Sequence, residues 1–591
     1  MYISTLRVKR LAVVGAVAGV ATLFLAGCTT TTDTGTADAS GGTVRIAEVN
    51  ELSSFNTGTA DGNVDINNQL DYFTQGDFFH LDDTASVVYD EGFGTVELLS
   101  EEPLSVKYTV NDDVVWSDGE PIDADDMLLG WAAQSGYFDD ADADATVGTT
   151  YFTPAGSTTG LDLTAFPEVG DDGESITVTY SGPYADWTLF SPMSVPAHVL
   201  AEKAGFEPDG MIAILEAATE GDVDAPVETN ADLRAVADFW NNGYVTSSLP
   251  SDSSLYLSSG PFMVSSWDPA QSVTLAVNDT YTGDLSPEGI DQIVVRFIAD
   301  ANAQVQALQN GEVDIINPQA SADTLSSLEA LSGINVMTGD TGSYDHVDLN
   351  FAAGGVFADA NVREAFLKTI PREQSLDAII RPLDPEAELL NSQIFFPGVN
   401  GYDEAASTNG SDAYDTVDIA GATALLAGAT PTVRVAYSNA NTNRVDAFLA
   451  IQASAAEAGF IVVDGGLPAD QWGDALALPE TWDAFIFGWS TVGAGVLGVP
   501  QLFDSSSDSN FGKFSDPAAD ALMDELLTTT DPETQVELQV GVEKALWAGG
   551  FGLPMYVLPG VIAFGPNVDG VEYSPWQTGP IWNFWDWTMA A

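Results

Sequence analysis

Cysteine and histidine are the side chains that most often bind transition metals, and this chain has few of them. It contains one cysteine, Cys28, and three histidines far apart in the sequence, His80, His198 and His346. A structural zinc site needs about four such ligands at short, regular spacings. The sequence therefore predicts no Cys/His metal site, no intramolecular disulfide and no bound cofactor.

Sequence motifs of the common catalytic and nucleotide-binding sites are absent or incomplete. There is no Gly-x-Ser-x-Gly, Walker or His-Glu-x-x-His sequence. Residues 493–498, GAGVLG, match the Gly-x-Gly-x-x-Gly pattern of dinucleotide sites, but such a site also requires a helix that begins there. Pro500 and the non-periodic residues after it argue against a helix, so we interpret this segment as a glycine-rich loop.

Acidic side chains dominate the charge of the chain. There are 88 Asp and Glu residues against 16 Lys and Arg, and the net charge at pH 7 is −72. A surface of this kind repels nucleic acid and anionic lipid, and we interpret it as an adaptation for solubility in a salty or acidic medium. So many carboxylates form pairs by chance, and their number alone does not identify the acid–base pair of a glycoside hydrolase.

The N-terminal segment predicts secretion. Three basic residues within the first ten precede a mostly apolar run, Leu11–Ala26, which is shorter than the about 20 residues of a membrane-spanning helix. Leu25-Ala26-Gly27-Cys28 then matches the lipobox of bacterial lipoproteins. We therefore predict a signal peptide at residues 1–27 and lipidation of Cys28.

Residues 28–42 are polar and small, which is typical of a flexible tether between a lipid anchor and a folded domain. Two alternatives to this interpretation are an uncleaved membrane anchor and a different type of cleavage in which Cys28 plays no part.

Residues 114–131, VVWSDGEPIDADDMLLGW, predict a strand, a tight turn and a helix. Asp118-Gly119 favours the turn, and Asp123 can cap the helix at its free N–H groups. Apolar residues then recur on one side of the helix, namely Met127, Leu128, Trp131 and Ala132. We interpret these residues as a structural corner that does no chemistry.

This stretch closely resembles the signature of the peptide-binding family of ABC-importer solute-binding proteins, the dipeptide, oligopeptide and nickel group. The matching residues are Trp116, Asp118, Gly119, Pro121, Ala124, Asp126 and Trp131. Further segments resemble the family in the same order along the chain, at residues 259–283, 311–315, 362–373 and 552–556. The resemblance extends over roughly residues 44–587.

The resemblance implies an α/β fold of the periplasmic-binding-protein type, with two lobes joined by a hinge. Lobe I is expected to be discontinuous, and the chain is expected to cross between lobes near Ala299 and Leu553. The predicted divisions are residues 43–83, 185–298 and 553–591 for lobe I, 84–184 for its subdomain, and 299–552 for lobe II. Hydrophobic periodicity adds a β-α-β unit within residues 432–463.

The resemblance also implies that ligand binds between the lobes. In peptide-binding members, the segment that corresponds to Gly488-Trp489-Ser490-Thr491-Val492 lines the cleft, and an aspartate three residues after the tryptophan binds the peptide's ammonium group. Val492 occupies that position here, and an apolar side chain cannot compensate a buried ammonium. Thr59, Ala60 and Asp61 are expected on the opposite wall. An equally good interpretation of Trp489 is a core aromatic residue.

We therefore expect a lipid-anchored, extracytoplasmic solute-binding component of an ABC importer that closes on its ligand without reacting with it. Peptide is the first choice of ligand, and an oligosaccharide or another small solute is the alternative. The expected partners are the solute, ABC permease subunits and the membrane reached through Cys28, with no nucleic acid, and the protein is expected to be a monomer. A lipid-anchored hydrolase and a ligand sensor without transport are alternatives from other classes.

Overall fold

The computed structural model describes residues 42–141, 147–468, 471–490, 495–507, 509–576 and 578–590. The predicted signal peptide, Cys28 and most of the predicted tether lie outside these residues, so their processing stays a prediction. Within the described part of the chain, none of the helices has the length and apolar character needed to span a membrane.

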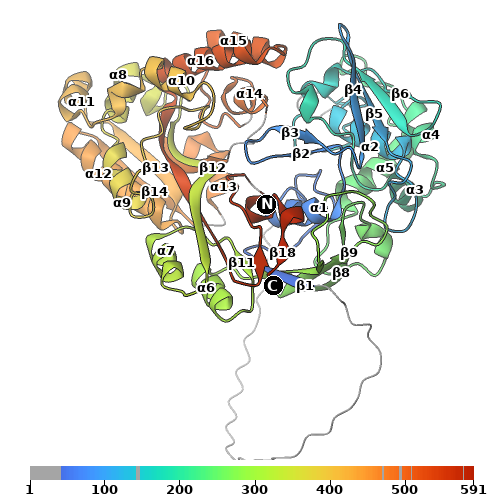
Figure 1. Cartoon of the computed structure of the whole chain (residues 1–591). Helices are drawn as coiled ribbons and strands as arrows, with labels where there is room; N and C mark the ends of the chain where they lie inside the picture. Colours follow the sequence, from blue (N-terminus) through green and yellow to red (C-terminus); the bar gives the residue numbers. More distant parts are fainter. Residues whose placement is uncertain are drawn as a thin grey trace, which may run out of the picture. The chain divides into compact units, whose positions relative to one another are not determined.

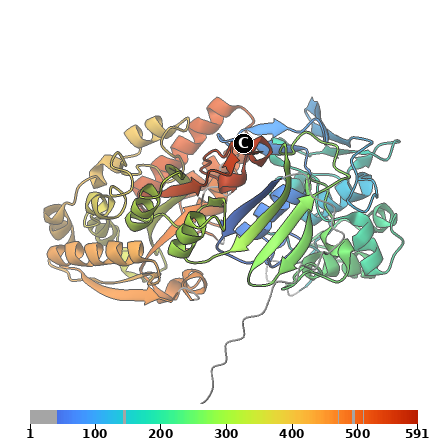
Figure 2. The same cartoon turned by 60° about the horizontal axis from the view of Figure 1, so that its bottom comes forward.

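A mixed sheet of ten strands organises the described chain (Figure 1). Its strands are β1 (Gly42–Glu48), β8 (Phe262–Asp268), β9 (Ser272–Val277), β10 (Ile290–Phe297), β11 (Ile315–Ile316), β12 (Asn335–Leu349), β13 (Thr432–Ser438), β14 (Ile461–Leu467), β15 (Ala484–Ser490) and β16 (Gly552–Phe564). They lie in the order β14-β13-β15-β12-β16-β11-β1-β10-β9-β8. Figure 2 shows β1, in blue, beside the green strands that come more than 200 residues later.

Two long antiparallel strands, β12 and β16, connect the two ends of this sheet. Near its start β12 pairs with the end of β16, which also pairs with β11, whereas residues 343–349 of β12 pair with β15. The register of β12 against β16 shifts between Asp340 and Tyr344. β16 contributes Ile562 to one hydrophobic core and Leu553 to another, so this strand passes from one core to the next.

The core that contains Ile562, called the first core, forms on β1, β8, β9 and β10. Helix α1 (Asp65–Thr74) covers it with Ile66, Leu70 and Phe73. On the other face of the sheet, α6 (Ala301–Gln309) and α7 (Ala322–Glu329) pack against Ala47 and Val561. The short strands β17 (Val568–Asp569) and β18 (Thr588–Met589) pair close to the C-terminus.

The core that contains Leu553, called the second core, forms under β13, β15 and β16. Its helices are α8 (Ala360–Leu367), α9 (Arg372–Ile379), α11 (Ile419–Leu426) and α12 (Thr442–Ala458). β13 and β14 are parallel and joined through α12, which confirms the predicted β-α-β unit. Other helices of this part are α10 (Tyr402–Thr408), α13 (Trp472–Leu476), α14 (Gly498–Phe503), α15 (Pro517–Leu527) and α16 (Pro532–Gly549). The predicted lobe boundaries stay a prediction.

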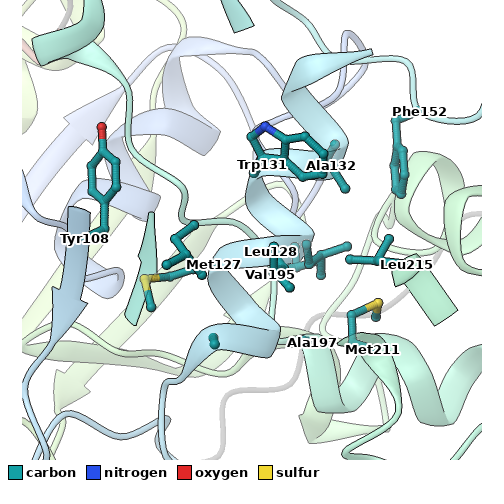
Figure 3. Close-up of a cluster of buried hydrophobic side chains, with 14 of the residues drawn as sticks. Tyr108, Met127, Leu128, Trp131, Ala132, Phe152, Val195, Ala197, Met211 and Leu215 are labelled. Carbon is teal, nitrogen blue, oxygen red and sulfur yellow. The ribbon is translucent and has the colours of Figure 1, made fainter. Parts of the chain in front are cut away.

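A four-stranded sheet and its helices form a third core, called the subdomain core. Its strands are β4 (Gly94–Glu101), β5 (Leu104–Val110), β6 (Glu168–Val169) and β7 (Ser175–Thr179), and its helices are α2 (Ala124–Ser135), α3 (Ala197–Ala204), α4 (Met211–Glu216) and α5 (Ala231–Asn242). A short hairpin of β2 (Phe79–Leu81) and β3 (Val87–Tyr89) precedes them. Figure 3 shows Trp131, Met127 and Leu128 of α2 among the side chains of this core.

The corner predicted at residues 114–131 forms as expected. Asp123 precedes α2 and accepts a hydrogen bond from the N–H of Asp125 at 2.8 Å, while Asp126 accepts one from the N–H of Asp123 at 3.1 Å. These two reciprocal bonds satisfy donors that a helix N-terminus leaves free. Trp131 is fully buried and donates its indole N–H to Thr164.

The prediction that no helix begins at the end of the Gly-x-Gly-x-x-Gly match is wrong. Helix α14 begins at Gly498 and includes Pro500. Pro500 lies in the first turn, where backbone N–H groups have no partner within the helix, so proline costs no hydrogen bond there. The N–H groups of Val496 and Leu497 donate to the carboxylate of Asp186. A side chain of the protein itself therefore occupies this helix N-terminus.

Candidate functional site

A pocket of about 540 Å³ lies between the first core and the subdomain core. Its wall combines segments that are far apart in the sequence: the loop of residues 52–58 after β1, helix α1, residues 189–196, residues 255–261, and Phe584 with Trp585. Trp240 of α5 and Tyr244, just after this helix, also belong to the wall. A pocket of this size is within the range of about 300–1,000 Å³ typical of small-molecule sites.

Helix α1 presents one side to this pocket. Asn67, Leu70, Asp71 and Thr74 line the wall, at the three- and four-residue spacing of one helix face. The neighbouring face, with Ile66 and Phe73, packs into the first core. α1 is therefore fixed by apolar contacts on one side and leaves polar groups at the pocket on the other.

Three carboxylates line the pocket, those of Asp71, Asp77 and Asp90. Burial, with repulsion from Asp77 added, raises the pKa of Asp71 to about 7, and no described residue donates a hydrogen bond to its carboxylate. Asp77 accepts hydrogen bonds from the Ser191 hydroxyl and from the N–H of Phe78, yet burial still raises its pKa to about 6. Burial disfavours the charged form of both side chains.

The described wall contains no lysine and no arginine that could neutralise these carboxylates. The imidazole of His80 lines the pocket and packs against Trp585, with ring centroids 4.8 Å apart. Burial lowers the pKa of His80, so this ring is neutral at pH 7.

Four side chains of the wall carry a buried polar atom without a partner among the described residues. These atoms are the Nδ1 of His80, the indole Nε1 of Trp116, the hydroxyl of Tyr244 and the Oγ of Ser258, and each is covered by neighbouring atoms on the pocket side as well. Trp116 and Ser258 are 1% exposed and Tyr244 is 3% exposed. Buried polar atoms are nearly always hydrogen-bonded, because an unmade bond costs about 1–3 kcal/mol.

The residues predicted for one wall, Thr59, Ala60 and Asp61, lie beside this pocket and not in its lining. Asn56, Thr57 and Gly58 line it instead. Thr59 is buried, and its hydroxyl accepts a hydrogen bond from the N–H of Gly62 at 3.1 Å. Ala60 and Asp61 are exposed in the turn that follows, so their role in binding stays a prediction.

The residues predicted for the other wall begin at the end of β15. Gly488 lies opposite Asp345 of β12, and a Cβ atom added at Gly488 would lie 3.0 Å from both Asp345 and Arg444. Arg444 and Asp345 form a buried ion pair at 2.9 Å. Glycine therefore leaves room for this ion pair against the strand.

Trp489 is partly buried and stacks on Phe511, with ring centroids 5.8 Å apart and planes at 9°. Its other neighbour, His346, is buried and contacts Asp348 through Nδ1 at 2.7 Å. Ser490 pairs with Ser343 through the backbone, and Thr491 and Val492 lie outside the described residues. Neither Gly488 nor Trp489 lines the pocket, and the role of this predicted wall in binding stays a prediction.

A contact that the sequence did not predict joins two parts of the molecule. One part contains the first core and the subdomain core, and the other contains the second core. Asp186 is buried and accepts hydrogen bonds from the N–H groups of Val496 and Leu497 at 2.9 and 2.8 Å. Ala185 donates to the carbonyl of Leu527 at 2.8 Å. A Cβ atom at Gly495, where φ is +77°, would lie 2.6 Å from the Asp186 carboxylate, so this close approach requires glycine.

Neither the pocket carboxylates nor Asp186 were found from the sequence. The available signal for Asp71 was its position on one helix face with Asn67 and Thr74, a pattern that also describes an ordinary solvent-exposed face. Within the described residues, no group of three or more His, Cys, Asp or Glu side chains has an arrangement suited to a metal ion.

Comparison with known proteins relates the chain to a large class of binding proteins. The family model of bacterial extracellular solute-binding proteins, family 5, matches residues 97–511. The oligopeptide-binding protein OppA of Mycobacterium tuberculosis is 26% identical over 533 residues, which are 88% of this chain and 81% of OppA. An uncharacterized lipoprotein of the same species is 26% identical over 548 residues, or 91% of this chain and 92% of that protein.

The fold is also similar to that of solved structures. The periplasmic EDTA-binding protein EppA superposes with a TM-score of 0.78 at 22% identity, over 93% of this chain and 97% of EppA. This likeness confirms the predicted two-lobed α/β fold, in which β12 and β16 form the strand connection described above.

Proposed function

We propose that this chain, which belongs to family 5 of the bacterial extracellular solute-binding proteins, captures peptides outside the cytoplasm and delivers them to the permease of an ABC importer. The family binds solutes and is not a family of enzymes, so the ligand is released unchanged. The name of the OppA relative, which aligns along most of both chains, supports peptide as the ligand.

The observation that carries this proposal is the 540 Å³ pocket, whose wall combines aromatic side chains with polar groups that include the carboxylates of Asp71, Asp77 and Asp90. Apolar surface provides affinity, and a few fixed polar groups provide orientation. Extended peptides need both, because their main chain alternates hydrogen-bond donors and acceptors while their side chains are variable.

Closure of the two parts on the ligand follows from the strand connection and from the Asp186 contact. β12 and β16 are the long strands shared by both cores, and the register irregularity at residues 340–344 interrupts their ladder. The described pocket wall comes only from the part with the first core and the subdomain core, so a ligand favours the closed state where it extends beyond the pocket to the part with the second core. The closed protein is then the form that the permease recognises, and it acts as a monomer.

Attachment to the membrane through Cys28 completes the proposal. The lipobox at residues 25–28 and the lipoprotein relative support it. A tether of about 14 polar residues would let the folded part move near the permease while staying at the membrane surface.

The test is a thermal-shift screen of the purified protein against dipeptides to nonapeptides, with oligosaccharides of matched size as a second set. A ligand at a hundredfold excess over its Kd stabilises the folded state by about 2.7 kcal/mol, which is measurable. Peptide-induced shifts support the proposal. Shifts with oligosaccharides alone would replace the peptide with the alternative solute class.

Two further measurements separate the other classes of function. Mass spectrometry of the peptide after incubation detects turnover, and a cleaved product would contradict a binding protein. Uptake of labelled peptide by cells with and without the protein tests delivery, and unchanged uptake would leave a ligand sensor as the better description.

A further inference from the structure

The carboxylate of Asp71 faces a pocket without a protein counter-charge. Asp71 lies on the side of α1 that lines the pocket, and Asp77 follows the end of this helix. Asp77 has two hydrogen-bond donors of its own, Ser191 and the N–H of Phe78, whereas Asp71 has no described donor. Hydrogen bonds within the protein therefore compensate part of the cost of burying the Asp77 carboxylate. No described hydrogen bond compensates the burial of the Asp71 carboxylate.

The rest of the described lining does not neutralise this pair. Asp90 is a third acid, His80 is neutral, and no Lys or Arg reaches the wall. An unpaired carboxylate in a partly buried position is costly unless a cation approaches it. The missing partner is therefore expected to arrive with the ligand.

Aromatic rings complete the environment. Tyr72, Phe79, Tyr256 and Trp585 also line the pocket. Aromatic faces attract cations and cover the aliphatic stems of lysine-like and arginine-like groups. By contrast Asp61, the acid expected on this wall from the resemblance, is exposed and does not line the pocket.

We propose that this pocket binds a positively charged group of the solute, an ammonium or guanidinium, and that Asp71 with Asp77 beside it supplies the counter-charge. This inference rests on the proposed function and names the class of peptide, one with a free amino terminus or a basic side chain. The shared chemistry is a cation with hydrogen-bonding protons, and the two sources are distinguished by experiment.

The experiment measures Kd by calorimetry at pH 8 for four peptides: Ala-Lys-Ala and Ala-Met-Ala, each with a free and an acetylated amino terminus. Wild type is expected to bind at least one cationic member tenfold or more tightly than the doubly neutral acetyl-Ala-Met-Ala. Preference for free amino termini identifies the α-ammonium as the cation, and preference for lysine identifies the side chain.

Asp71→Asn is expected to remove this preference while retaining weak binding of the neutral peptide. Asp61→Asn, which changes the same charge outside the pocket, is the matched control and should keep the preference. Asp77→Asn should weaken the preference less than Asp71→Asn does. Circular dichroism and the melting temperature establish that each variant is folded.

Different outcomes of these measurements test the proposed cation subsite and the proposed binding of peptides. If all four peptides bind equally to wild type, or if Asp71→Asn keeps the preference, the cation subsite is overturned while peptide binding stands. If no peptide binds but arginine or spermidine does, with loss in Asp71→Asn, the subsite stands and the peptide assignment fails. If none of these probes binds, both proposals are overturned.

Discussion

Asp71 combines a half-buried position with a charge that the protein does not neutralise. The pKa of its carboxyl is raised from 3.8 to about 7, first because burial disfavours the ion and then because Asp77 repels it. Burying this carboxylate without a counter-charge lowers the stability of the folded protein. A binding site can include such a group, because the ligand later supplies the counter-charge.

This cost predicts a pH dependence. Between pH 3.8 and about 7 the folded protein keeps a proton that the unfolded chain has released, so the Asp71 contribution to stability falls as pH rises through this window. Asp71→Asn removes the penalty. Its melting temperature without ligand should exceed that of wild type by about 2 °C at pH 8, with the difference shrinking toward pH 4.

Scanning calorimetry at pH 4.5, 6 and 8 measures this difference. The other titratable side chains that line the same pocket are Tyr72, Asp77, His80, Asp90, Tyr244, Tyr256 and Tyr281. A variant less stable than wild type at pH 8 would mean that Asp71 has a structural partner, and it would contradict the interpretation of this carboxylate as uncompensated.

Cys28 carries the second prediction at this scale. Cys28→Ala removes the thiol to which lipid would be attached, so the variant should appear as the unprocessed precursor or in the medium. Fractionation and intact mass of both proteins measure this. A variant that stays in the membrane fraction with the mass of the wild-type protein would exclude lipidation at Cys28.

Among the secondary-structure elements, the short helix α14 takes part in a contact with the subdomain core through the backbone at its N-terminus. The N–H groups of Val496 and Leu497, just before this helix, bind Asp186, which follows Tyr184 of the subdomain core. Val496 and Val499 also belong to a small core with α15 and α16. The strand connection through β12 and β16 lies elsewhere, so this contact is a second link between the subdomain core and the part with the second core. We expect it to stabilise the closed conformation.

Asp186→Ala should therefore raise the Kd of the ligand about tenfold, because a charge-assisted hydrogen bond contributes about 1.5–3 kcal/mol and here only to the closed state. Asp186→Asn, which keeps one acceptor oxygen, should recover part of the affinity. X-ray scattering of the liganded variants reports closure. Unchanged affinity together with unchanged scattering in Asp186→Ala would show that the contact does not favour closure.

Elements with local signals could be predicted from the sequence, and contacts made over long distances could not. The capping residues Asp123 and Asp126 fixed the start of α2, and hydrophobic periodicity found the unit β13-α12-β14. The prediction based on Pro500 was wrong because the sequence does not show that this residue lies within the first turn of α14. The error was one of helix register, and proline is acceptable in the first turn only.

The candidate site was harder to predict because its wall is assembled by tertiary structure. The face of α1 with Asn67, Asp71 and Thr74 has the composition of a solvent-exposed face. Other segments, among them the nearby loop at residues 52–58 and the distant Trp585, turn it into a pocket wall. The resemblance led to Thr59–Asp61, a few residues beyond the part of the loop that lines the pocket.

For the whole molecule, the net charge of −72 leaves most acidic groups without a basic partner, since 16 Lys and Arg face 88 Asp and Glu. Unpaired charges of one sign repel each other and destabilise the compact state. The same field attracts cations, so a positively charged ligand would associate faster at low salt, and the rate should fall as salt screens the field.

Salt should accordingly raise the stability of the folded protein. The screening length falls from about 30 Å at 0.01 M to about 3 Å at 1 M salt, so repulsion across the surface is largely removed within this range. We expect the melting temperature to rise with sodium chloride and to level off near 1 M, and to rise also on moving from pH 7 to pH 5 at low salt, where protonation removes part of the charge. Sucrose at matched osmolality controls for solvent exclusion, and a melting temperature that is flat in salt but rises in sucrose would show that self-repulsion does not limit the stability of this protein.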